Sequence, residues 1–264
     1  MHTSGVIKFL NDTKRHQGLN VDDKGSTSGG DVTSPWDLAL DRGKSIDPEL
    51  THLASRYMDS LLQGDRRAAS ELILEAVDRG KPIRNLYLDV FQPVQRKVGR
   101  LWQTNAITVA VEHFCTAVTQ TVMSQLFPLV ITEKKNGLSM VGCCVGHEIH
   151  ELGIRMVCDF FEMESWETCY IGANCPSKTI IKTIMDKDAN VLCLSVTMNH
   201  NLPQTKSVIQ EISKSFPKTK VMVGGLCFLL NPDLAQDIGA HGWARDAQEG
   251  VDMATAWCRE SLHE

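Results

Sequence analysis

Hydrophobic residues recur three and four positions apart throughout the first half of the chain. Four segments with this pattern follow one another, joined by short connections that contain glycine or proline: residues 47–64, 65–80, 82–101 and 108–129. Apolar residues at this spacing share one face of an α-helix, so each segment is expected to bury one side. Four consecutive amphipathic helices with short connections predict an antiparallel four-helix bundle.

After Gly137 the pattern changes to short apolar runs that alternate with amphipathic segments. The expected strands are Leu138–Val145, Glu167–Ile171, Val191–Val196 and Lys220–Val223, and the expected helices are Glu151–Glu162, Lys178–Lys187, Pro203–Ser215 and Ala247–Ser261. Strands that are apolar on both faces belong in a buried parallel sheet. The second half therefore predicts an α/β fold with a Rossmann-like (flavodoxin-like) parallel sheet.

These patterns predict three parts, namely a flexible N-terminal arm (1–46), the bundle (47–135) and the α/β domain (136–264). The arm is polar and rich in glycine and serine, so it buries too little apolar surface to offset its ordering entropy. The net charge is −5, and no cluster of basic residues suggests direct binding to nucleic acid. No segment resembles a signal peptide or a membrane span, and the nine cysteines have no zinc-like spacing, so a cytoplasmic protein with reduced thiols is expected.

The loop after the first strand carries a candidate metal ligand. Ligands of parallel sheets bind at the carboxyl ends of the strands, and His150 lies in the loop that follows Val145. An imidazole binds a transition metal through one nitrogen when the other is hydrogen-bonded, and Glu148 is well placed to accept that bond. Gly153 leaves room for a bulky group beside the following helix. The plain alternative is that His150 caps a helix or lies on the surface.

Two further loops reach the same edge of the predicted sheet. Ser195 and Thr197 follow the third strand and offer hydroxyl groups to a polar ligand. Gly224 and Gly225 follow the fourth strand and permit close backbone approach. A glycine pair in such a loop is otherwise only a tight turn.

Taken together, these loops resemble the cobalamin-binding domains that hold the cofactor in its base-off, His-on form. Their motifs, D/ExHxxG, SxL/T and GG, match Glu148-x-His150-x-x-Gly153, Ser195-x-Thr197 and Gly224-Gly225. The resemblance implies that His150 coordinates cobalt from below, that Glu148 orients it, and that Ser195 contacts the displaced dimethylbenzimidazole. It also implies that the three glycines make room for the nucleotide tail. The upper ligand, whether adenosyl, methyl or hydroxo, stays open.

The helical half suggests a class of cobalamin protein. Trp102 is followed, nine residues later, by Glu112 and His113, which resembles the W-x9-EH signature of light-sensing cobalamin regulators, the CarH-type repressors and AerR-type antirepressors. In that family these side chains pack over the upper ligand. The alternative is that Trp102 fills the core and that Glu112 and His113 lie on a solvated helix surface.

The chain departs from the repressors in two ways. Residues 1–46 are too short and polar for a DNA-binding domain, and Gln103 stands where the repressors carry a histidine thought to bind cobalt after photolysis. The resemblance therefore predicts a light-responsive antirepressor without catalysis of its own, which controls a partner transcription factor and does not bind DNA. The alternative is a corrinoid methyl carrier of a methyltransferase system.

Overall fold

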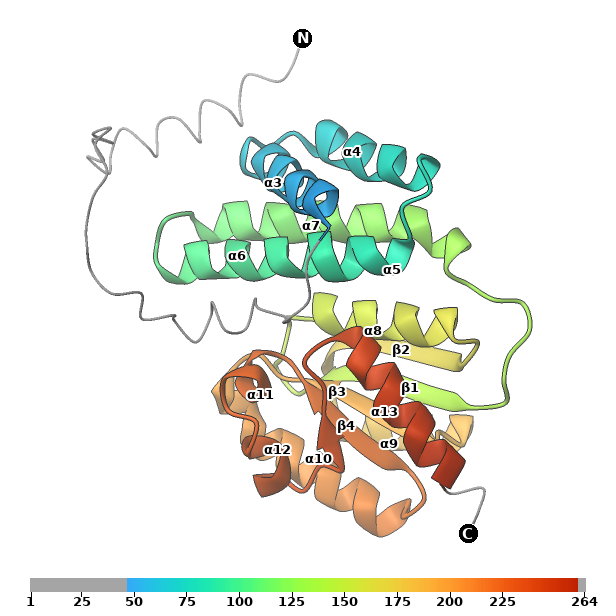
Figure 1. Ribbon diagram of the computed structural model, residues 1–264. Coiled ribbons are helices and arrows are strands. Elements are labelled where there is room, and N and C mark those ends of the chain that lie inside the picture. Colours follow the sequence, from blue (N-terminus) through green and yellow to red (C-terminus); the bar gives the residue numbers. More distant parts are fainter. Residues whose placement is uncertain (1–46, 261–264) are drawn as a thin grey trace. The chain divides into compact units, whose positions relative to one another are not determined.

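The structure is a computed structural model that describes residues 47–260 (Figure 1). The predicted N-terminal arm lies outside these residues. The contacts divide the chain into a helical unit, residues 47–82 and 89–122, and an α/β unit, residues 83–88 and 123–260. This division differs from the boundary expected near residue 135, because the end of the fourth helix and a short segment of the third belong to the α/β unit.

The helical unit is built from α3, α4, α6 and most of α7. Their bounds, with the short elements between them, are α3 Pro48–Leu62, α4 Arg66–Asp78, α5 Ile83–Asn85, the π-helix η1 Leu86–Phe91, α6 Gln92–Gln103 and α7 Val109–Leu126. The side chains of Asp47 and Asp65 accept hydrogen bonds from backbone N–H groups in the first turns of α3 and α4. The four predicted helices are therefore confirmed, with α4 beginning where its N-cap residue predicts.

The α/β unit contains five parallel strands in the order β2-β1-β3-β4-β5. The strands are β1 Ser139–Val145, β2 Glu167–Cys175, β3 Val191–Ser195, β4 Lys220–Gly224 and β5 Gly242–Trp243. This is the flavodoxin-like order, in which β2 is added on one side of β1 and the later strands are added on the other side. The direction in which strands are added therefore reverses between β1 and β3. The predicted Rossmann-like class is confirmed, and the reversal places the loops after β1 and β3 next to each other.

Helices cover both faces of the sheet (Figure 1). They are α8 Leu152–Met163, α9 Ser177–Lys187, α10 Leu202–Ser215, α11 Leu226–Leu230, α12 Leu234–Asp237 and α13 Ala247–Glu260. One face packs a hydrophobic core against α9 and α10, and the other packs against α8 and α13. All of β1 and β3 is buried, which explains why both strands are apolar at every position but one or two.

The pattern of the sequence misses β5, α11 and α12, because elements of two to five residues are too short to show a period. It also ends β2 too early. The strand continues to Cys175 through Gly172 and Asn174, which both have positive φ, and its register with β1 shifts there. β2 therefore bulges at its carboxyl end, next to the loop that follows β1.

A buried carboxyl on α8 makes the stability of the α/β unit depend on pH. Asp159 accepts a hydrogen bond of 2.8 Å from the Tyr87 hydroxyl. Burial raises the pKa of Asp159 to about 6, although the bond from Tyr87 opposes the rise. The folded state therefore favours the protonated acid. Its contribution to the free energy of unfolding is complete below about pH 4 and is lost as the pH rises through 6.

Replacing Asp159 with asparagine should remove this pH dependence, because the amide oxygen still accepts from Tyr87 and carries no charge. We expect Asp159→Asn to match the parent at pH 4 and to be more stable by about 2 kcal/mol at pH 8. Urea denaturation at both pH values measures this. The exposed Asp233→Asn serves as the control. A difference that is equal at both pH values would contradict the prediction.

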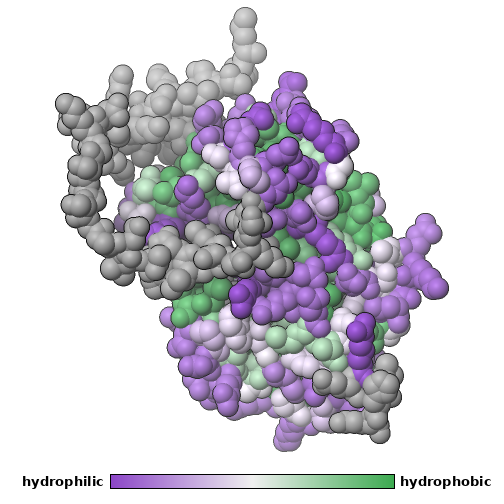
Figure 2. Space-filling view, in the orientation of Figure 1, coloured by the Kyte–Doolittle hydropathy of each residue, from purple (hydrophilic) through white to green (hydrophobic). Residues whose placement is uncertain are grey.

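Exposed apolar side chains of the α/β unit gather after α7. Phe127, Leu129 and Ile131 are 39%, 63% and 49% exposed, whereas Val130 between the last two is buried. Figure 2 shows hydrophobic colour at the right-hand edge, where this segment lies.

Within residues 47–260, every helix is too short or too polar to cross a bilayer.

Candidate functional site

The candidate site is the loop between β1 and α8, which the structure holds at both ends. β1 ends at Val145, and Gly146 turns the chain with a φ of +60°. The Gly146 N–H donates to the Cys175 carbonyl at 3.0 Å, and the Glu148 carbonyl accepts from Asn174 at 2.9 Å. The bulged end of β2 therefore fixes the loop that carries Glu148 and His150.

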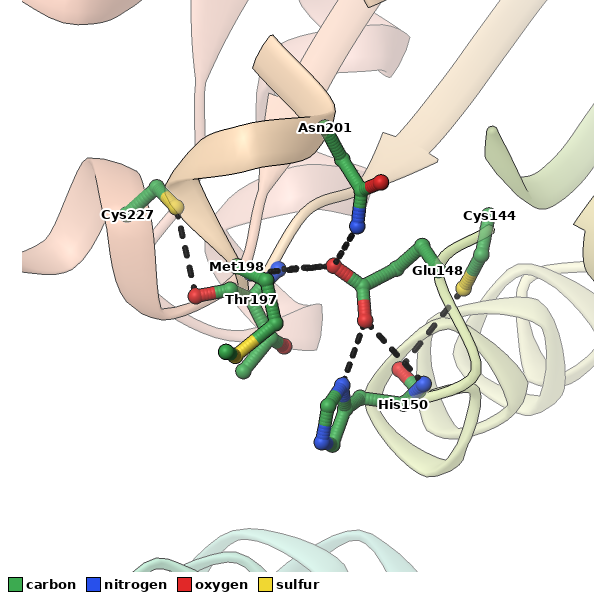
Figure 3. A network of polar contacts seen from close by, with 7 residues as sticks. All are labelled: Cys144, Glu148, His150, Thr197, Met198, Asn201 and Cys227. Carbon is green, nitrogen blue, oxygen red and sulfur yellow. Dashed lines mark hydrogen bonds and ion pairs between the residues drawn. The ribbon is translucent and has the colours of Figure 1, made fainter. Parts of the chain in front are cut away.

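Glu148 lies at the centre of a polar network (Figure 3). Its side chain is fully buried, and its Oε1 accepts from the Nδ1 and the backbone N–H of His150. Its Oε2 accepts at 2.9 Å from the backbone N–H groups of Thr197 and Met198 and from the Asn201 amide. One carboxylate thus joins the loop after β1 to the loop after β3, as the order of the strands requires.

These hydrogen bonds determine the charge of Glu148 and the position of the proton on His150. Burial by itself would raise the pKa of Glu148, but the donors from His150, Met198, Thr197 and Asn201 outweigh it and lower the pKa to about 2. The carboxylate is therefore ionised at neutral pH. It holds a proton on Nδ1 of His150, so the lone pair of a neutral imidazole is on Nε2, which points away from Glu148 in Figure 3.

Ser195 and Thr197 take part in different ways. Ser195 is buried at the end of β3, where it lies in register with Cys144 of the neighbouring strand β1. Thr197 contributes through its backbone: its N–H donates to Glu148 and its carbonyl accepts from the Cys227 thiol at 3.3 Å. The sequence analysis selected Thr197 for its hydroxyl, whereas its hydrogen bonds to Glu148 and Cys227 use main-chain atoms.

The glycine pair after β4 lies against the loop after β3. Gly225 has a φ of +99°, and a β-carbon there would stand 2.5 Å from the Val196 carbonyl oxygen. Gly224 is less restricted, since its nearest neighbour would be the Ala244 carbonyl oxygen at 3.4 Å. Only glycine fits at Gly225, because both its conformation and its backbone neighbour exclude a side chain. Among residues 47–260, a β-carbon on Gly153 would meet no atom within 4 Å beyond its chain neighbours and the backbone of its own helix.

Two partners of Glu148 were not foreseen. Asn201 is buried and lies more than fifty residues from Glu148 in the chain, and Met198 contributes only its backbone N–H. No motif marks either residue. Their position after a strand that ends beside β1 is the one signal that points to them, and it becomes visible only with the sheet order.

The remaining predicted residues belong to the helical unit. Trp102 is half-buried near the end of α6, whereas Glu112 and His113 lie in the first turns of α7. Glu112 accepts from the Thr116 hydroxyl at 3.0 Å, and the side chain of His113 is 66% exposed, with its Nε2 3.6 Å from Glu112. Their contact with an upper ligand stays a prediction.

Comparison with known proteins identifies the family of this chain. Two family models, both described as a B12 binding domain, match residues 138–252 and 53–127, which together make up well over half of the chain. The chain belongs to the B12-binding proteins. It binds cobalamin, as the loops after β1, β3 and β4 predict.

Its curated relatives include dimethylamine corrinoid proteins. Dimethylamine corrinoid protein 3 of Methanosarcina mazei is 28% identical over 134 residues, which make up 50% of this chain and 78% of the relative. Its namesake in Methanosarcina acetivorans is 29% identical over 124 residues, or 46% of this chain and 57% of the relative. The fold matches that of the Methanosarcina barkeri monomethylamine corrinoid protein, with a TM-score of 0.68 at 17% identity, over 77% of this chain and 97% of that one.

These relatives overturn part of the sequence-based interpretation. The prediction of a light-responsive antirepressor with a transcription factor as its partner is wrong, because the relatives are named as corrinoid proteins of methylamines. The W-x9-EH spacing of Trp102, Glu112 and His113 misled us. Three side chains on two helices restrict the function of a B12-binding protein too little.

The loops of the α/β unit fit a cobalamin. His150 is 35% exposed and presents Nε2, a nitrogen donor suited to cobalt. In the part of the chain that the structure describes, only the chain neighbours and the backbone of α8 itself lie within 4 Å of a β-carbon placed on Gly153, so a bulky ligand has room at the start of α8. We propose that His150 ligates cobalt, that Glu148 orients it, and that Gly153, Gly224, Gly225, Ser195 and Thr197 line the site of the nucleotide tail.

Gly153 offers a test that separates folding from binding. Alanine favours the helix over glycine by up to about 1 kcal/mol, so Gly153→Ala should leave the unloaded protein at least as stable as the parent. The added methyl group should nevertheless lower cobalamin affinity, roughly tenfold, because it enters the space assigned to the cofactor. Absorbance titration and thermal unfolding measure the two effects. Unchanged affinity would show that the tail lies elsewhere.

Proposed function

We propose that this protein is a corrinoid methyl carrier of a methyltransferase system. Bound cobalamin supplies a cobalt ion that accepts a methyl group and releases it again. The observation that carries the proposal is the buried Glu148, which presents His150 at the carboxyl edge of a B12-binding domain whose relatives are corrinoid proteins of methylamines. The chain's own residues hold and orient the cofactor, and separate methyltransferases are its partners.

The residues of the site suit a carrier because they control the lower ligand. The ionised Glu148 keeps a proton on Nδ1 and so increases the electron donation of Nε2. Oε2 of the same carboxylate accepts from Thr197, Met198 and Asn201, whereas Oε1 accepts from His150, so Glu148 is held by bonds that do not involve His150. His150 can therefore bind or leave cobalt while its orienting group stays in place.

The experiment that tests this function uses the full chain loaded with hydroxocobalamin and reduced. It is offered mono-, di- or trimethylamine, each with a methyltransferase specific for that amine, and the absorbance of the bound cofactor is followed. We expect methylation with at least one amine, followed by demethylation when a second methyltransferase and a thiol acceptor are added. A chain that binds cobalamin but is methylated in none of the three systems would contradict the proposal.

A further inference from the structure

Two cysteines lie close to the loop that carries Glu148 and His150, in neighbouring strands. Cys143 is in β1 and Cys175 is the last residue of β2, and both are buried in the hydrophobic core that the sheet forms with α9 and α10. β1 and β2 lie side by side as parallel strands (Figure 1). Both thiols are free, so two cysteine side chains share one face of the sheet near its carboxyl edge.

The bulge of β2 turns the side chain of Cys175 back toward Cys143. In the ladder of β1 and β2, Cys143 is paired with Gly172. The next pair joins Val145 to Cys175, so three residue steps along β2 match two steps along β1. The Cys175 thiol folds back over this bulge and lies 3.3 Å from the Gly172 carbonyl oxygen. It therefore reaches the level of Cys143, the ladder partner of Gly172.

The two thiols also affect each other's ionisation. The Cys143 thiol is the main cause of a lowered pKa of Cys175, which burial opposes, whereas the Cys175 thiol and burial raise the pKa of Cys143 well above its usual value. Groups interact in this way only at close range. Cys175 is therefore the more nucleophilic of the two, because the thiolate is the reactive form. It is also the thiol that a small oxidant meets first, since the adjacent Asn174 is exposed.

The backbone around Cys175 supports the loop that is proposed to hold cobalamin. The Cys175 carbonyl accepts from the Gly146 N–H at 3.0 Å. The preceding residue, Asn174, donates its N–H to the Glu148 carbonyl at 2.9 Å. A disulfide draws the Cys175 sulfur away from the backbone carbonyls that it now contacts and so shifts this end of β2. The oxidation state of Cys175 therefore bears on the position of Glu148.

We propose that Cys143 and Cys175 are a redox-active pair that closes to a disulfide when hydrogen peroxide reaches it and thereby weakens cobalamin binding. The Cys175 thiolate attacks one peroxide oxygen, the O–O bond breaks, hydroxide leaves, and a sulfenic acid forms on Cys175. The Cys143 thiol then attacks that sulfur, the S–S bond forms, and water leaves. Two thiols lose two electrons in total, and one peroxide is reduced to two waters.

Peptide mapping tests for the bond directly. The full chain without cofactor is treated with hydrogen peroxide, its remaining thiols are blocked, and it is digested without a reductant for mass spectrometry. We expect a peptide that links Cys143 to Cys175, loss of two of the nine thiols, and recovery of both with dithiothreitol. Absence of this link, or a link from Cys175 to Cys144 instead, would overturn the proposal.

The effect on cobalamin is measured after the peroxide has been removed. Oxidation of the parent should lower its affinity for hydroxocobalamin about tenfold, the low end of the cost of disturbing an outer-shell partner, and dithiothreitol should restore it. The control variant Cys193→Ala removes a buried thiol of β3 that lies outside this core, and it should respond to peroxide as the parent does. Cys175→Ala cannot form the bond, so peroxide should leave its affinity unchanged.

A further variant checks the order of the two steps. In Cys143→Ala the sulfenic acid on Cys175 has no partner thiol, so dimedone should label Cys175 after peroxide treatment. A parent that forms the disulfide but keeps its affinity would disprove the effect on the loop, and an equal loss of affinity in Cys175→Ala would assign that loss to another group. The proposal rests on cobalamin binding alone. No measurement involves a methyl donor, so its failure is distinct from a failure of the methyl-transfer test.

Discussion

Replacing His150 with alanine is expected to lower cobalamin affinity by at least about 100-fold, which exceeds the 10- to 100-fold cost typical of an outer-shell partner. The variant loses the one imidazole that the Glu148 carboxylate orients, so the bound cofactor should also lose the spectrum of a nitrogen-ligated cobalt. Absorbance titration with hydroxocobalamin gives both quantities.

The control for this variant is His147→Ala, which removes an exposed imidazole from the same loop. It should keep the affinity and spectrum of the parent. Removal of His150 also withdraws a donor from a buried carboxylate, at a cost of roughly 1–3 kcal/mol to the unloaded protein, so unfolding must be measured alongside. A folded His150→Ala protein with the parent's spectrum would show that another group ligates cobalt.

Replacing Glu148 with glutamine should damage both binding and folding. The amide has a single acceptor oxygen for five donor contacts, and its NH2 group would face N–H groups of His150 or of the loop after β3. We expect cobalamin affinity to fall about 10- to 100-fold and the free energy of unfolding to fall by about 3 kcal/mol. Binding titration and urea denaturation measure these effects.

Two matched variants decide whether the charge or the shape of Glu148 matters. Glu148→Asp keeps the carboxylate, and we expect it to bind within about tenfold of the parent. Glu133→Gln removes an exposed carboxylate outside the site and should change neither quantity. If Glu148→Gln bound as tightly as Glu148→Asp, the orienting role of the charge would be disproved.

The sequence alone was sufficient for the main elements and for the central pair of the site. The helical periodicity predicted α3, α4 and α7, because each helix is long enough to show one buried face. The apolar runs predicted β1, β3 and β4, because each strand is buried on both faces. Glu148 and His150 are two residues apart, so their contact is local and follows from the motif itself. Local pattern also predicted which loops bind cobalamin, and this assignment stays a prediction.

The class of B12-binding protein was not determined in the same way. Trp102, Glu112 and His113 are too few residues to specify the class of a cobalamin protein, since helix surfaces accept many residues without loss of stability. Neither the bundle nor the loops specify whether a partner is a transcription factor or a methyltransferase. That distinction came from the relatives.

Only the tertiary structure decided how the distant parts of the site meet. The order β2-β1-β3-β4-β5 brings the loops after β1 and β3 together, and a single buried carboxylate then collects donors from Thr197, Met198 and Asn201. It also assigned Ile83–Leu88 to the α/β unit. The hydrophobic periodicity of a sequence shows that a residue is buried but does not show which neighbour it packs against. The reason is that burial against any apolar side chain is favourable to nearly the same degree.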